Sequence, residues 1–61
     1  MKFRIITDKY NWTMCDDIAQ DATVFLANHL YKSPANNHNF LMANDGTLIS
    51  LDKIIAIEVL E

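Results

Sequence analysis

The chain has little of what usually holds a small protein together or gives it chemistry. Its 61 residues include one cysteine, one proline and one glycine. The single cysteine, Cys15, excludes an intramolecular disulfide, and the four-ligand spacing of a structural zinc site is also absent. Because a domain of this size buries only about 60% of the surface that its unfolded chain exposes, oligomerisation is the remaining way to add buried surface.

Basic residues are also few. Five Lys and Arg stand against eight Asp and Glu, which gives a net charge of −3. The positive charges are scattered along the chain at Lys2, Arg4, Lys9, Lys32 and Lys53, whereas a nucleic-acid binder usually gathers them in a stripe. Nucleic-acid binding is therefore an alternative that needs an oligomer to bring Lys2, Arg4 and Lys53 to one rim.

Long apolar runs are missing too. The opening Ile5 and Ile6 are followed at once by a polar segment that includes Asp8, so the apolar region of a signal peptide is not visible. No stretch has the length of a membrane span. We expect a cytoplasmic protein with no membrane partner.

What the chain does contain is an apolar end. With 51% hydrophobic and 21% charged residues it is typical of one globular domain, over residues 1–61. In a regular strand from residue 54, one face would carry Ile55, Ile57 and Val59, and the other Ile54, Ala56 and Leu60. A strand that is apolar on both faces indicates two-sided burial. One helix can cover only one face, so we expect a second copy or a partner protein on the other.

The remaining elements follow from local patterns. We predict a strand at 2–7, a turn at 8–12, a helix at 14–31 with Thr13 as its N-cap, a loop at 33–38, and strands at 39–43 and 47–51 joined by Asn44-Asp45-Gly46. A strand at 23–26 is the competing prediction for the middle of the helix. The order β-α-β-β-β indicates an α+β fold, an antiparallel sheet with one helix packed on one face.

Three side chains with possible chemistry have simpler interpretations. Cys15 lies near the proposed helix start, but neither histidine is placed to act as its base, so we expect a buried or half-buried small apolar residue. His29 is expected in the core or an interface, bonded to backbone, and His38 in solvent. The acidic residues Asp16, Asp17 and Asp21 are expected to form a solvated face at the start of the helix.

Aromatic residues add candidates for an interface. Tyr10 and Trp12 lie in the predicted first turn, and Tyr31 closes the predicted helix. Such side chains are frequent anchors at protein interfaces, although Trp12 could equally pack over the end of the sheet. The predicted interface comprises Ile54, Ile55, Ile57, Val59, Leu60, Trp12, Tyr10 and Tyr31.

The sequence of residues 40–58, FLMANDGTLISLDKIIAIE, together with the opening MKFRIITD, resembles short uncharacterised proteins of bacteriophages and related mobile elements. The resemblance covers roughly half of the chain and lies in structural motifs only. It implies a small accessory or inhibitory protein that binds a host factor, commonly as a homo-oligomer. The tail also resembles LytTR-type DNA-binding domains, but the chain is shorter and lacks their basic surface, so DNA binding is not carried over.

These observations favour a non-enzymatic binding protein, homodimeric or larger, that inhibits or modulates a host protein by contact. No cofactor, metal or catalytic residue is expected. Besides nucleic-acid binding, a further alternative is sequestration of a small molecule or nucleotide in a pocket at the subunit junction, lined by Trp12, Tyr31 and His29.

Overall fold

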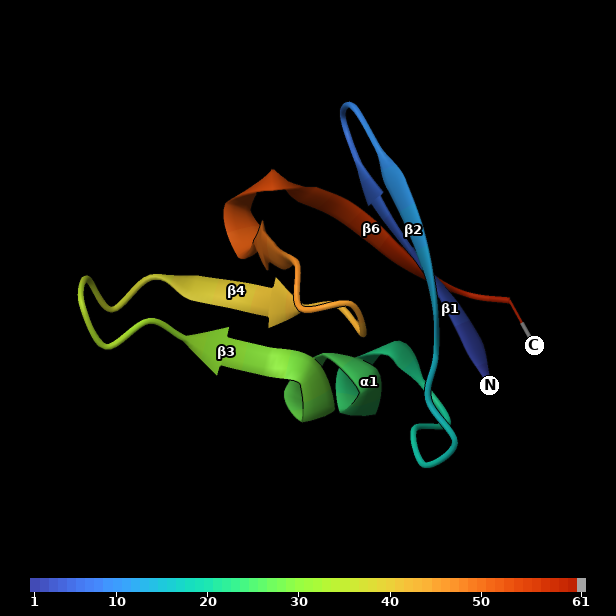
Figure 1. The fold of residues 1–61 in the computed structure, drawn as a ribbon. Helices are drawn as coiled ribbons and strands as arrows, with labels where there is room; N and C mark the ends of the chain where they lie inside the picture. The colour runs from blue at the N-terminus through green and yellow to red at the C-terminus, as the bar shows by residue number, and fades with distance from the viewer. Residues whose placement is uncertain (61) are drawn as a thin grey trace.

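Over residues 1–60, the computed structural model shows two three-stranded antiparallel sheets and one α-helix (Figure 1). The elements in chain order are β1 (Lys2–Thr7), β2 (Asn11–Cys15), α1 (Ala22–His29), β3 (Leu30–Lys32), β4 (Asn39–Met42), β5 (Leu48–Ser50), a single 3₁₀ turn η1 (Leu51–Lys53) and β6 (Ile54–Val59). The predicted α+β class is confirmed. The structure adds β2 and β3 to the predicted strands and divides all strands between two sheets, ordered β2-β1-β6 and β3-β4-β5.

The first sheet is built around β1, whose predicted bounds are confirmed. The side chains of Phe3 and Ile5 are fully buried. Their partners across the sheet are Met14 and Trp12 on β2, and Val59 and Ile57 on β6. The two ends of the described chain meet here (Figure 1), where the N–H of Leu60 donates to the carbonyl of Lys2 over 2.9 Å.

The predicted terminal strand is also present, but its side chains do not alternate regularly. Ile6 pairs with Ala56 while Thr7 pairs with Ile54, so Ile55 is the extra residue of a β-bulge. The bulge turns both Ile54 and Ile57 toward the core, against which they pack half-buried. Ile55 is left 69% exposed. The prediction that Ile55 and Ile57 share one face is therefore wrong.

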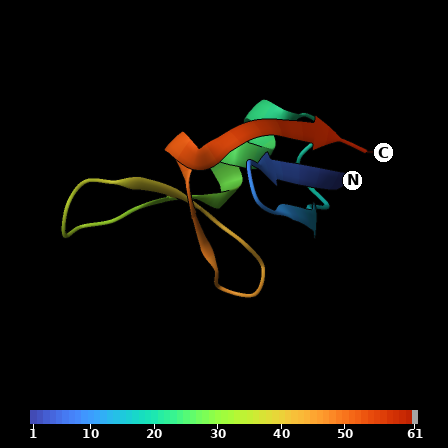
Figure 2. The same cartoon turned by 90° about the horizontal axis from the view of Figure 1, so that it is seen from above.

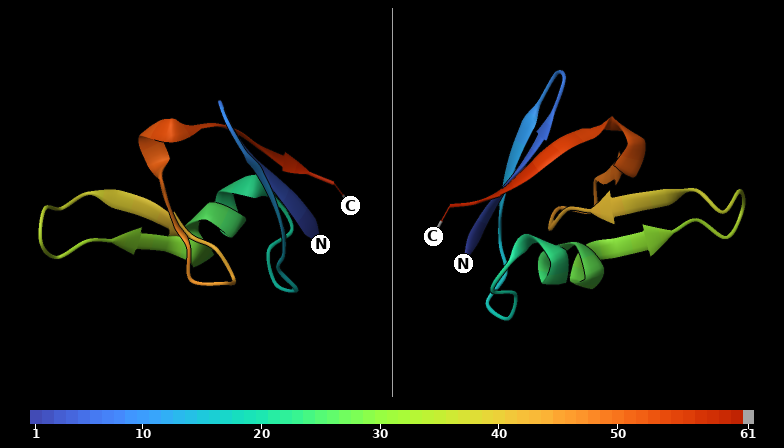
Figure 3. Two further views of the ribbon diagram at one scale, coloured as in Figure 1. Left: turned by 45° about the horizontal axis from the view of Figure 1, so that its top comes forward. Right: turned by 180° about the vertical axis from the view of Figure 1, so that it is seen from behind.

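The second sheet contains the predicted hairpin. Gly46 adopts φ +91°, which only glycine adopts freely, and the N–H of Ala43 donates to the carbonyl of Thr47 over 2.8 Å to close the turn. The side chain of Asp45 accepts from the N–H of Thr47, also within the turn. The longer loop between β3 and β4 projects away from the rest of the molecule (Figure 3).

The helix is shorter than predicted and begins later. Residues 11–15 form β2 instead of a turn and a helix start, because Trp12 and Met14 alternate inward beside β1. The N-cap is Asp21, whose side chain accepts from the N–H of Val24, so Thr13 is not the cap. The C-terminal end of the predicted helix, from Leu30, is strand β3. The competing strand at 23–26 is wrong, since these residues are helical.

The core lies between the first sheet, α1 and β4–β5. Its fully buried centre is the stacked pair Phe3 and Phe25, with ring centroids 4.3 Å apart, an arrangement worth roughly 0.5–1.5 kcal/mol beyond the buried area. Leu41 and Ile49 close it from the second sheet. Helix α1 contacts both β6 and β4, and β6 passes over it in Figure 2. The helix therefore covers the inward face of β6, as predicted for one face.

Candidate functional site

The most exposed apolar part of the first sheet is the edge strand β6. In an antiparallel pair, residues alternate between pointing their backbone groups at the partner strand and away from it. Leu60 bonds to Lys2, so the register makes Glu58 the next residue bonded to β1 and turns the backbone groups of Ile57 and Val59 to the open edge. This edge is six residues long and has no strand beside it among the described residues.

Side chains on both sides of this edge are apolar. Ile55 is 69% exposed, Val59 45% and Leu60 38%. The outward face is not apolar throughout, however, because Arg4 and Glu58 form an exposed ion pair there at 3.3 Å. The predicted apolar outer face is thus restricted to the bulge around Ile55, beside Ile6 and Ala56 of the next cross-strand pair.

The structure brings only part of the predicted interface together. Tyr10, directly before β2, and Trp12, on β2, lie edge to face with ring centroids 5.9 Å apart. Tyr31 is elsewhere, on β3 opposite Phe40. Within one chain the predicted pocket residues are also separated, since Trp12 lines one cavity, His29 lines another, and Tyr31 is in neither lining.

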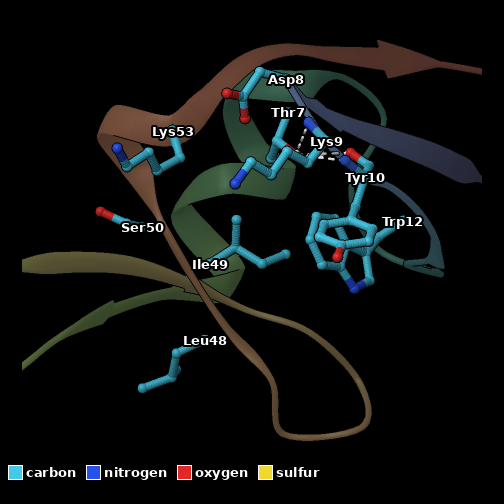
Figure 4. A pocket seen from close by; sticks show the side chains of 9 residues that line it. All are labelled: Thr7, Asp8, Lys9, Tyr10, Trp12, Leu48, Ile49, Ser50 and Lys53. Atoms are coloured by element: carbon cyan, nitrogen blue, oxygen red, sulfur yellow. Dashed lines mark hydrogen bonds between the residues drawn. The ribbon is translucent and has the colours of Figure 1, made fainter.

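The cavity beside Trp12 has a volume of about 340 Å³ and lies between the β1–β2 turn and the segment from β5 to η1 (Figure 4). Ile49 points into the labelled group, with Tyr10 and Trp12 on one side and Lys53 on the other, whereas Leu48 points away. The volume is at the lower end of the range for ligand pockets. This cavity was not expected from the sequence, because β5 and the first turn are nearly forty residues apart and meet only through the fold.

The turn that supports Tyr10 is fixed by one hydroxyl group. Thr7 Oγ1 donates to the carbonyl of Tyr10 over 2.9 Å and accepts from the N–H of Tyr10 and, at 3.4 Å, from that of Lys9. The Thr7 N–H also donates to the Tyr10 carbonyl. These bonds hold one wall of the cavity in place, although Tyr10 itself is 66% exposed.

A buried carboxylate ties the end of β2 to α1. The Asp16 side chain accepts hydrogen bonds from the N–H groups of Ala19 and Ile18, at 2.9 and 2.8 Å, and from the side chains of Asn28 and His29. These donors, the two backbone groups first, hold the pKa of the Asp16 carboxyl far below its usual range. The expectations of a solvated Asp16 and a backbone-bonded His29 are wrong. Both groups serve the fold.

Cys15 does not share in this network. It is exposed and lies opposite Lys2, which contradicts the expected burial. It lines a shallow cavity of about 460 Å³ together with Asp16 and His29. The His29 Nε2 is 3.0 Å from the Asp16 carboxylate, and Cys15 has no hydrogen-bond partner among residues 1–60. A thiol without a bonded base is not activated as a nucleophile in this geometry.

A second polar cluster, on the outward side of β4 and β5, was missed by sequence reasoning. His38 Nε2 lies 2.6 Å from Ser50 Oγ, and the Ser50 hydroxyl donates to the Asp52 carboxylate. This hydrogen bond, followed by the electrostatic interactions of Asp52 with His38 and Lys53, lowers the pKa of Asp52. The expectation of a solvated His38 is incomplete, since its ring also packs on Phe40 at 4.8 Å. Only the register of β4 and β5 could have revealed the cluster.

The residue types of this cluster match a catalytic triad, but their order does not. In a triad, histidine stands between the serine and the acid and takes the serine proton. Here the Ser50 hydroxyl stands between His38 and Asp52, and its proton points to Asp52. The closest His38–Asp52 approach is 3.9 Å. The arrangement therefore stabilises the η1 turn and does not generate a nucleophile.

Within residues 1–60, no three His, Cys, Asp or Glu side chains are grouped so that they could hold a metal ion. Over the same residues, no helix has the length and apolar character needed to cross a membrane. No protein-family model, curated protein or solved structure matches this chain.

Proposed function

We propose that this chain is a non-enzymatic binding protein that associates with a second copy of itself through β6 and acts by occupying a surface of another protein. The observation that supports the proposal is the open edge of β6, where the backbone groups of Ile57 and Val59 are unpaired by any strand of the described chain. An open edge of this kind is a ready template for pairing with another strand.

Two copies related by a two-fold axis can pair their β6 strands antiparallel, since each copy presents the same backbone groups. The β2-β1-β6 sheets of the two copies then become one continuous six-stranded sheet, and the open β6 edge of each copy is paired. The exposed side chains of Ile55, Val59 and Leu60 flank this edge and become buried between the copies. For a chain with so small a core of its own, this burial adds needed stability.

The test is the mass in solution, measured by size-exclusion chromatography with light scattering. The wild-type chain of 7.0 kDa is expected to elute at twice that mass or more. Ile55→Asp is expected to elute as a monomer, because it places a charge in the apolar rim of the pairing edge. Because the side chain of Ile55 is 69% exposed within one chain, the monomeric variant is expected to remain folded.

The matched control is Ile18→Asp, which makes the same change at a side chain that is 79% exposed and lies in the loop before α1. Ile18→Asp is expected to keep the wild-type mass. A monomeric wild type, or loss of association in both variants alike, would contradict pairing through β6.

The wider setting follows from the resemblance to short bacteriophage and mobile-element proteins. We propose that the chain works in the cytoplasm of a host cell and inhibits or modulates a host protein. The alternative of nucleic-acid binding has less support, because the chain has a net charge of −3 and only five basic residues, whereas nucleic-acid binders usually gather basic residues in a stripe.

A further inference from the structure

A second open edge carries an inference of its own. The N–H of Ala43 donates to the carbonyl of Thr47, so these residues are a bonded pair across β4 and β5. By alternation, Ile49 is the next residue of β5 bonded to β4, and the backbone groups of Leu48 and Ser50 point to the open side. The cavity of about 340 Å³ lies along this side of β5.

The walls of this cavity suit an extended chain. Ile49, which is 5% exposed, lines it from β5, and the half-buried ring of Trp12 lines the opposite wall. An incoming strand would thus find hydrogen-bonding groups on one side and an apolar surface for alternate side chains on the other. A small ligand would leave the open backbone groups of Leu48 and Ser50 unpaired, whereas an extended peptide can form hydrogen bonds with both residues.

The charge of the cavity differs from that of the chain. Two of the five basic residues, Lys9 and Lys53, line it together with a single acidic residue, Asp8. No salt bridge joins Lys9 or Lys53 to another described residue. Lys53 also interacts electrostatically with Asp52, which is not among the residues that line the cavity. The lining itself carries one net positive charge on an acidic protein, and this charge complements a carboxylate.

We propose that the open edge of β5 receives a short extended segment of another protein, which pairs with Leu48 and Ser50, packs an apolar side chain against Trp12 and directs Asp or Glu to Lys9 and Lys53. This deepens the proposed binding function by naming the class of partner. It uses a different surface from β6 and does not depend on self-association.

The probe is an acetylated and amidated peptide of alternating Val and Glu, compared with its isosteric Val and Gln counterpart. Trp12 is the only tryptophan and reports binding by its fluorescence. The acidic peptide is expected to give a saturable change and to bind about tenfold more tightly than the amide peptide, a difference of about 1.4 kcal/mol. Backbone pairing is expected to slow amide hydrogen exchange at Leu48 and Ser50.

The variant that tests the site is the double change Lys9→Gln with Lys53→Gln, which is expected to remove the preference for the acidic peptide. Lys32→Gln, an exposed lysine on β3, is the matched control and should bind as the wild type does. Ile55→Asp should also bind the acidic peptide normally, so failure of β6 pairing and failure of the β5 site are distinguishable.

Three results would overturn the proposal. One is the absence of saturable binding of the acidic peptide. Another is equal affinity for the acidic and amide peptides. The third is binding of free glutamate or inorganic phosphate as tight as that of the peptide, with no slowing of exchange at Leu48 and Ser50, which would assign the cavity to a small anion.

Discussion

Each of the two sheets has two edge strands, and the open edges of β6 and β5 differ in length and in what surrounds them. The β6 edge is six residues long and is flanked by the exposed apolar side chains of Ile55, Val59 and Leu60. The β5 edge is three residues long and opens on a cavity that contains Trp12 and Lys53.

This difference separates two ways of binding. A long edge with apolar side chains can bury enough surface to pair stably with an identical strand. A short edge offers backbone bonds at only two residues and must gain the rest of its affinity from an adjacent cavity and from charge. In the two proposals, one small domain uses one surface for its own copy and another for a segment of a different protein.

The largest expected effect is the difference in the free energy of unfolding between a charge placed on the inward side of β6 and one placed on its outward side. Ile57→Asp places a charge against the core and is expected to lower the free energy of unfolding by about 3 kcal/mol or more, which leaves a domain of this size largely unfolded. Urea denaturation followed by circular dichroism measures it. Ile55→Asp, at the bulge, is expected to change monomer stability by less than about 1 kcal/mol. Similar losses of stability in both variants would contradict a bulge that turns Ile57 inward and leaves Ile55 outside.

A smaller effect is expected from two carboxylates, that of Asp16 before α1 and that of Asp52 in η1. The pKa of Asp16 in the folded protein is far below the ordinary value of 3.8, so its bonds stabilise the fold above that value. This stability is lost as the pH falls through the folded pKa. The pKa of Asp52 is lowered too, but its side chain is 68% exposed.

Asp16→Asn is therefore expected to destabilise the protein at neutral pH and to flatten the fall in stability below pH 3.8. Asp52→Asn should change the stability and its dependence on pH much less, because solvent screens the exposed carboxylate. Thermal unfolding monitored between neutral and acidic pH compares them. An equal response of the two variants would show that the Asp16 network does not join β2 to α1.

The smallest expected effect concerns the turn that forms β5. Gly46→Ala meets no neighbouring atom within 4 Å, so only the backbone conformation at φ +91° opposes it. The change is expected to cost about 1 kcal/mol in stability and to leave the mass of the oligomer unchanged. It should also weaken binding of the acidic peptide, because the turn at Gly46 positions β5 beside β4. A change in mass would show that the two edges are coupled.

Local signals predict much of this fold. The alternation of residues 2–7, the Asn44-Asp45-Gly46 turn and the apolar terminal strand all have bounds close to those observed. The helix prediction is less accurate, because Thr13 and Asp16 form a plausible capping pattern before residues with helical spacing. In the structure Asp16 does bond to backbone N–H groups, but in the loop before α1, and Asp21 caps the helix.

The sites depend on features that sequence patterns do not contain. The bulge at Ile55 exists only because β1 and β6 shift register between Ile6 and Thr7. The cavity forms because β5 and the β1–β2 turn meet across the core, and the contact of His38 with Ser50 requires the pairing of β4 and β5. The interface residues predicted on β6 remain candidates, and Ile55 is the most exposed of them.

The most direct test of the account is the solution mass of the wild type and of Ile55→Asp over a dilution series, with Ile18→Asp beside them. We expect the wild type at a multiple of 7.0 kDa that falls on dilution, a folded monomer for Ile55→Asp, and wild-type behaviour for Ile18→Asp. A well-folded wild-type monomer at every concentration would contradict self-association through β6.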